Sequence, residues 1–215
     1  IIEYKKKKKK IKETCYNADG AVNNTFIYEY GSNGNVKLIT MYNANGTKTR
    51  EEVMDSEGRK RKMIWFNADG TKNREDEYDT NYVWIKGSNY ENGEVYSVIV
   101  PEYDSAGNMI RTTLTKTDGT KFVQEYGSNG KVIKSISYNA DGIMESMSEF
   151  DSNGKVMKSF HYNADGTILS MSEYDNGELR NSIYYNADCT QNVAEYKEDG
   201  TVIYYTLDKD GNIIE

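Results

Sequence analysis

Glutamate recurs directly before an aromatic residue about every 24 residues along the chain. The series is Glu3, Glu29, Glu77, Glu102, Glu125, Glu149, Glu173 and Glu195, with Val53 as the exception. Carboxylate oxygens are the ligands that Ca²⁺ prefers, so such a row is one candidate cation site. The alternative is a charged, soluble surface in which glutamate pairs with lysine across each hairpin. We expect the second arrangement, and neither a resident metal nor a cofactor.

Catalytic chemistry has little basis in the sequence. His161 is the only histidine, and by the repeat it occupies a position that Ser137 and Tyr184 fill elsewhere, which indicates a structural role. No cysteines and histidines have the spacing of a metal site, and no glycine-rich loop precedes a helix. Neither cysteine has a histidine nearby in sequence to act as its base. The sequence predicts a protein that is not an enzyme.

Aromatic residues are the second candidate chemistry, because the chain contains 19 tyrosines. Rings with an apolar face and a polar tip can stack on sugars, or they can form the core. Segment 79–101 departs most from the repeat, since Tyr82 replaces a turn glycine, Trp84 takes an aliphatic position and the single proline ends the segment at Pro101. We predict ligand-binding residues Tyr82, Trp84 and Tyr96 in this segment.

The two cysteines, Cys15 and Cys189, do not form a disulfide framework. On a flat sheet they would lie roughly 65 Å apart, whereas a disulfide needs Cα atoms within about 7 Å. An intrachain bond would require the sheet to close on itself. A head-to-tail link between two copies and a pair of free thiols are the other two states, and all three stay open.

These side chains are positioned by a tandem repeat with two alternating motifs. The string YNADG occurs at 16–20, 138–142 and 162–166. The second motif appears as EYGSNG at 29–34 and 125–130, EYDSAG at 102–107 and EFDSNG at 149–154. Successive motifs begin about 12 residues apart over the whole chain, which indicates tandem duplication.

Each repeat step divides into a turn and a strand. The first motif is typical of a type I turn followed by a glycine at positive φ, the hairpin connection with a G1 bulge. In that register Asn163 faces Thr167 and Tyr162 faces Ile168. In the second motif Asp151 faces Lys155 and Phe150 faces Val156. Glycine, asparagine and aspartate recur too often for a helix of ten residues.

The predicted fold is all-β, an elongated antiparallel β-meander of about 18 short strands, in one tandem-repeat domain over residues 1–215. A sheet this wide is expected to be twisted, coiled or spiral. Strict alternation places Val156, Lys158, Phe160 and Tyr162 on one face. It continues that face through Ile168, Ser170, Ser172 and Tyr174 on the next strand. The tyrosines form one stripe near each edge.

Composition excludes several partners. The net charge is -7 and the pI is about 5.0, which argues against nucleic acid as a partner. No apolar run is long enough to span a membrane, and no signal peptide is visible, so we expect a piece of a longer protein.

The run Lys5 to Lys10 replaces the first turn of the second type, and is either a solvated segment or a patch that binds polyanions.

The segments EYDSAGNM at 102–109 and EFDSNGKV at 149–156 resemble the YD repeat of RHS-type bacterial proteins. That resemblance implies a long spiral sheet on a secreted or surface-exposed protein, in some members enclosing a toxin. The segment YDNGEL at 174–179 also looks like MORN-type hairpin repeats, and the YNADGT string looks like choline-binding cell-wall repeats. The Gly-Trp pair that supplies the choline cage is absent from this sequence.

The function expected from the sequence is a non-enzymatic, extracellular or cell-surface bacterial scaffold or adhesive module. One alternative is a self-assembling filament subunit, in which ribbons stack or join end to end. Another is a glycan-binding module that uses its tyrosine and tryptophan stripes. The expected partners are therefore further copies of the chain or a cell-surface glycan.

Overall fold

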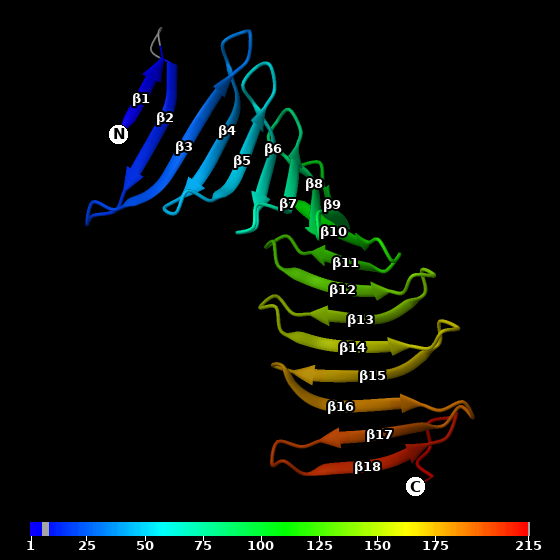
Figure 1. The fold of residues 1–215 in the computed structure, drawn as a ribbon. Coiled ribbons are helices and arrows are strands. Elements are labelled where there is room, and N and C mark those ends of the chain that lie inside the picture. The colour runs from blue at the N-terminus through cyan, green and yellow to red at the C-terminus, as the bar shows by residue number, and fades with distance from the viewer. Residues whose placement is uncertain (6–8, 215) are drawn as a thin grey trace. The chain divides into compact units, whose positions relative to one another are not determined.

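The computed structural model describes residues 1–5 and 9–214 (Figure 1). In these residues it contains eighteen β-strands and no helix. The chain forms two compact units, Ile1–Val100 and Pro101–Glu215. Each unit is an antiparallel meander, so the all-β prediction is confirmed. The described residues hold no helix that is long and apolar enough to cross a membrane.

The first unit contains the strands up to and including most of β9. They are β1 Ile2–Lys5, β2 Lys9–Tyr16, β3 Val22–Tyr30, β4 Val36–Asn43, β5 Lys48–Met54, β6 Lys60–Phe66, β7 Lys72–Tyr78, β8 Trp84–Glu91 and β9 Glu94–Tyr103.

The second unit contains the remaining strands. They are β10 Met109–Lys116, β11 Lys121–Tyr126, β12 Val132–Tyr138, β13 Met144–Phe150, β14 Val156–Tyr162, β15 Ile168–Asp175, β16 Glu178–Tyr185, β17 Gln191–Tyr196 and β18 Val202–Leu207. The centre of the lysine run, residues 6–8, lies outside the described residues. Of its neighbours, Lys9 donates from Nζ to the Gly34 carbonyl at 2.9 Å.

The turns have the predicted register. The backbone N–H of Asn163 donates to the Thr167 carbonyl at 2.8 Å, and Tyr162 pairs with Ile168. Gly166 closes this turn at φ +84°, a conformation that glycine adopts without a steric cost. In the second turn type the Asp151 amide donates to the Lys155 carbonyl at 2.8 Å, and Phe150 pairs with Val156.

The predicted assignment of side chains to the two faces of the sheet is wrong, because most hairpins have an additional bulge beyond the turn. His161 pairs with Ser170 while its neighbour Tyr162 pairs with Ile168, so Leu169 is an extra residue without a partner. Ile168 and Ser170 therefore lie on opposite faces, although strict alternation puts them together. The same shift separates Val156 from Lys158 on β14.

The bulges also divide the tyrosines between the two faces. We call the face of Lys158 and Glu173 the charged face. Tyr162, beside a turn of the first type, lies on the charged face, whereas Tyr174, beside a turn of the second type, lies on the other one. The predicted stripe near each edge is thus correct, but the two stripes face opposite ways.

Apolar burial is sparse. Among the described residues, the buried hydrophobic side chains are Ile64 and Val193. Most strand residues are half-buried, and lysine stems cover several rings, as where Lys48 Nζ lies 3.8 Å from the Phe66 ring centre. Strand hydrogen bonds and cross-strand pairs of side chains therefore contribute much of the stability.

Candidate functional site

Three turns of the first type have a side-chain arrangement that we call the Asn–Asp–Thr clip and define by Asn67, Asp69 and Thr71. Thr71 donates to Asp69 Oδ1 twice, from its backbone N–H at 2.9 Å and from Oγ1 at 2.6 Å. Asn67 Nδ2 donates to Thr71 Oγ1 at 3.0 Å. The complete clip recurs at Asn163–Asp165–Thr167 and at Asn186–Asp188–Thr190.

The clip holds its aspartate in the ionised form. Hydrogen bonds donated by the Thr71 hydroxyl and then by its backbone N–H lower the pKa of Asp69 below its ordinary value. The corresponding donors lower the pKa of Asp165 and Asp188. A carboxylate that accepts several hydrogen bonds favours its charged state. Each clip therefore adds a fixed negative charge to its edge of the sheet.

The two edges of the sheet differ in how neighbouring turns meet. Among turns of the second type, Asn35 Nδ2 donates to the Ser56 carbonyl at 2.9 Å, and Asn129 Nδ2 donates to the Ser152 carbonyl at 3.2 Å. These bonds tie one turn to the next on that edge. On the edge of the clips, two pairs of neighbouring turns instead leave a groove between them.

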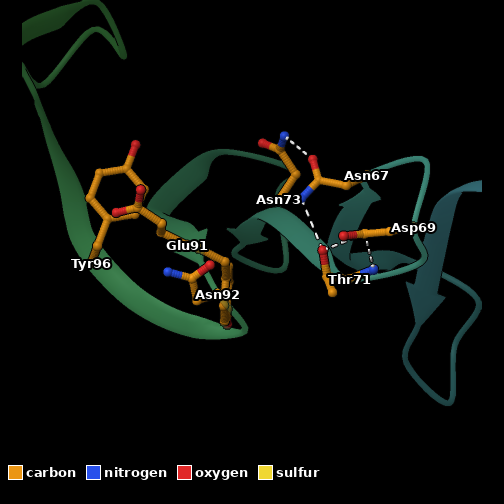
Figure 2. Close-up of a pocket in the computed structure, with 8 residues that line it drawn as sticks. Asn67, Asp69, Thr71, Asn73, Glu91, Asn92 and Tyr96 are labelled. Carbon is orange, nitrogen blue, oxygen red and sulfur yellow. Dashed lines mark hydrogen bonds between the residues drawn. The ribbon is translucent and has the colours of Figure 1, made fainter.

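Groove 1 lies in the first unit, between the β6–β7 turn and the β8–β9 turn, and has a volume of about 740 Å³. Its lining residues are Asn67, Asp69, Thr71, Asn73, Tyr90, Glu91, Asn92 and Tyr96. Figure 2 shows the clip and Asn73 on one wall and Glu91, Asn92 and Tyr96 on the other. The volume lies within the range of about 300–1,000 Å³ that is usual for small-molecule sites.

The clip wall of groove 1 is held in place by its own hydrogen bonds. Asn73 Nδ2 donates to Asn67 Oδ1 at 2.7 Å, which extends the clip by one residue (Figure 2). Asn73 is the extra residue of the bulge on β7, since Lys72 pairs with Phe66 and Arg74 with Trp65. The bulge thus places an amide beside the clip.

The opposite wall is built on a two-residue turn. Glu91 pairs with Glu94, and Asn92 and Gly93 between them have φ +51° and +84°, the pattern of a tight hairpin. Tyr96 follows on β9 and is 41% exposed. Within residues 1–5 and 9–214, the side chains of Glu91, Asn92 and Tyr96 form no hydrogen bond with the protein, so their polar groups are open to a ligand.

Groove 2 lies in the second unit, between the β14–β15 and β16–β17 turns, and has a volume of about 690 Å³. It lies between two complete clips, those of Asp165 and Asp188, with Tyr184 and Tyr185 beside them. Cys189, in the position of the turn glycine, also lines it at φ +68°. The same edge therefore carries a similar groove in both units.

The predicted residues Tyr82, Trp84 and Tyr96 do not converge. Tyr96 lines groove 1, whereas Tyr82 lies in the β7–β8 turn on the other edge, 55% exposed at φ +65°. Trp84 begins β8, and its Nε1 donates to the Lys86 carbonyl at 2.8 Å while the Arg74 guanidinium lies 5.8 Å from its ring. β8, about 26 Å long, carries the chain from the edge of Tyr82 and Trp84 to the edge of Tyr96.

The sequence did not single out Asn73, Glu91 and Asn92. The signal was available, because turns two repeat steps apart fall on the same edge of a meander. The string Asn67–Asn73 and the shortened turn after Tyr90 are such a pair.

Most of the repeated glutamates lie opposite a lysine or arginine on a neighbouring strand, as predicted, whereas Glu195 faces Asn181 and Ile203. Lys158 Nζ is 2.8 Å from Glu173 Oε1, and Arg111 lies 2.9 Å from Glu125 and 3.6 Å from Glu102. In the part of the chain that the structure describes, no three histidine, cysteine, aspartate or glutamate side chains form a group that could hold a metal ion.

His161 and the cysteines occupy separate positions. His161 is exposed on β14, between its strand partners Ser146 and Ser170. Cys15 is half-buried on β2 in the first unit, and Cys189 is exposed in the second unit; both are free thiols.

One part of the chain matches a protein family. Residues 138–184, well under half of the chain, match the family described as "Protein of unknown function (DUF2963)". No curated protein matches the chain.

Several solved structures are similar to this chain at low sequence identity. TarM of S. aureus matches with 17% identity and a TM-score of 0.35, over 40% of this chain and 17% of that one. The Photorhabdus luminescens Tc holotoxin pore matches with 12% identity and a TM-score of 0.28, over 93% and 14%. A porin-like protein from Bacteroides uniformis matches with 11% identity and a TM-score of 0.32, over 90% and 85%. This chain spans less than a fifth of the first two, and similarity this low transfers neither activity nor partners.

Proposed function

We propose that this chain is a non-enzymatic β-repeat module of an extracellular or cell-surface protein, which serves as a scaffold and adhesive surface. The observation that carries the proposal is the recurrence of one hydrogen-bonded clip and one groove in both units. A module of this kind offers two similar weak sites. Weak sites on one chain give strong overall attachment when they engage the same surface together.

The charge pattern supports a surface role. Most of the repeated glutamates are paired with lysine or arginine on neighbouring strands, so these charges largely balance one another. Charged side chains also discourage sheets from pairing edge to edge. The YD-like motifs at 102–109 and 149–156 agree with an extracellular repeat protein of the RHS type.

A bead-adhesion assay tests the proposal. Beads carrying the full chain are washed over slides coated with neutral polysaccharide, acidic polysaccharide or serum albumin, and beads carrying the heat-denatured chain serve as the control. We expect retention on a polysaccharide coating above both albumin and the denatured control. Retention equal to the control on every coating contradicts the adhesive role.

The filament alternative makes a different prediction. A filament subunit must grow in mass as its concentration rises, whereas a scaffold module stays at one mass. Sedimentation velocity of the full chain over a wide concentration range separates the two. We expect a single species, and a sedimentation coefficient that rises steadily with concentration favours the filament.

A further inference from the structure

We propose that groove 1 is a binding site for an uncharged, hydroxyl-rich pyranose chain, with Tyr96 as its stacking platform and Asn73, Glu91 and Asn92 as its hydrogen-bonding groups. The inference rests on the proposed adhesive function and names the class of ligand that one of its grooves takes.

The two walls provide the kinds of group that sugar hydroxyls need. Each hydroxyl is both a donor and an acceptor, so it suits amides, which offer both, and carboxylates, which accept. The wall at the β8–β9 turn, which we call the far wall, offers Glu91 and Asn92, whose side chains form no hydrogen bond within the described residues. The clip wall is pre-ordered by the hydrogen bond between Asn73 and Asn67 and by the clip itself, which reduces the entropy lost on binding.

Tyr96 supplies the apolar part of the site. Its ring stands at the far wall and is 41% exposed (Figure 2). The C–H face of a pyranose ring is apolar and stacks on an aromatic face, while the phenol hydroxyl remains available for a hydrogen bond. Tyr90, the other ring of the groove, is already covered by Lys72, whose Nζ lies 5.0 Å from its centre.

The charges of the groove select against acidic ligands. Asp69 and Glu91 line it, and no lysine or arginine is among its lining residues. A uronic or sulfated sugar would bring its negative charge close to both carboxylates, which disfavours binding. The site therefore favours a neutral chain over an acidic one.

The test is titration of the full chain with cellotriose, maltotriose and triacetylchitotriose, followed by isothermal calorimetry and saturation-transfer NMR. We expect at least one trisaccharide to bind with a Kd of about 1 mM, as expected for one weak site in a multivalent module. Trigalacturonic acid, the acidic comparison, is expected to bind more weakly. No heat and no saturation transfer with any of the three neutral sugars overturns the proposal.

Three variants locate the binding. Tyr96→Ala removes the platform and is expected to weaken binding about tenfold. Asn92→Gly removes the amide yet keeps the positive φ of the turn, so it tests the hydrogen bond without disturbing the backbone. Tyr96→Phe keeps the ring, and is expected to retain most of the affinity.

The control is Tyr82→Gly, which removes an exposed tyrosine on the other edge of the same unit and suits the turn at φ +65°. We expect its affinity to equal that of the unaltered chain. Affinity lost in Tyr82→Gly but kept in Tyr96→Ala would move the site away from groove 1 and overturn the inference. Bead adhesion without trisaccharide binding would also overturn it, while leaving the proposed function intact.

Discussion

Lys158 on β14 lies directly opposite Glu173 on β15, and its Nζ is 2.8 Å from Glu173 Oε1. The neighbour of Lys158 on its other side is Glu149 on β13. Hydrogen bonding to Glu173 raises the pKa of Lys158 and lowers that of Glu173. One lysine on β14 thus lies between two carboxylates, one on each neighbouring strand.

Reversing this charge tests the row of ion pairs. In Lys158→Glu three carboxylates stand in line, and we expect a loss of about 1 kcal/mol in the free energy of unfolding. The effect is modest because the lysine side chain is 44% exposed and screened by water. Thermal unfolding followed by circular dichroism measures it. Adding Glu173→Lys should restore part of the loss at low salt, and a double variant no more stable than the single one contradicts the pairing.

Cys189 occupies a turn position at φ +68° that glycine fills elsewhere, as in Gly166 at φ +84°. The left-handed conformation costs a residue with a Cβ about 1 kcal/mol. We therefore expect Cys189→Gly to raise the melting temperature by about 2–4 °C. Cys189→Ala removes the same thiol but keeps the Cβ, so it should leave the melting temperature nearly unchanged.

Gly166→Ala provides the reverse test. A Cβ added there meets no atom within 4 Å, so only the backbone conformation opposes it. We expect a loss of about 1 kcal/mol in stability, measured by urea unfolding. An unchanged midpoint for Gly166→Ala would show that this turn tolerates a Cβ, and the argument for Cys189 would fail with it.

Acid should weaken the Asn–Asp–Thr clips. Hydrogen bonds from Thr167 lower the pKa of Asp165 in the folded chain. A group whose folded pKa is depressed contributes stability above its unfolded value, about 3.9 for aspartate, and loses it as the pH falls through the folded pKa. We therefore expect the free energy of unfolding to fall below about pH 4.

Thr167→Val isolates the contribution of the hydroxyl to this pH dependence. Without the Oγ1 donor, the pKa of Asp165 should rise toward its ordinary value and the acid-induced loss should shrink. Thr167→Ser keeps the donor and should behave like the unaltered chain. Carboxyl carbon NMR of Asp165 reads its titration directly, and identical titration curves in Thr167→Val and Thr167→Ser would disprove the role of the hydroxyl.

The turns were predictable because their chemistry is local. The register from Asn163 to Thr167 follows from a type I turn with glycine at positive φ, and the residues of this segment are typical of that turn. The faces were not predictable, because the bulge at Leu169 has no residue signature and one extra residue exchanges the two sides of the strand. The prediction that Ser170 shares a face with Ile168 was wrong for that reason.

The candidate site was only partly predictable. Tyr96 was grouped with Tyr82 and Trp84 because the three are close in sequence, but β8 carries the chain from one edge of the sheet to the other between them. Groove 1 depends on how far apart two turns of the same edge lie, the β6–β7 turn and the β8–β9 turn. No single motif encodes it.

The cysteines allow a test of intermolecular linkage. Cys189 is exposed and Cys15 is half-buried, and both are free thiols. Because thiol exchange requires access to the sulfur, we expect Ellman's reagent to modify Cys189 quickly and Cys15 slowly, two thiols in all. Cys189→Ser should remove the fast phase alone. Head-to-tail linkage predicts a ladder on a non-reducing gel after oxidation, and Cys15→Ser should reduce that ladder to dimers. Fast modification in Cys189→Ser, or a chain without reactive thiols before reduction, would contradict the accessibility that the structure gives to these two residues.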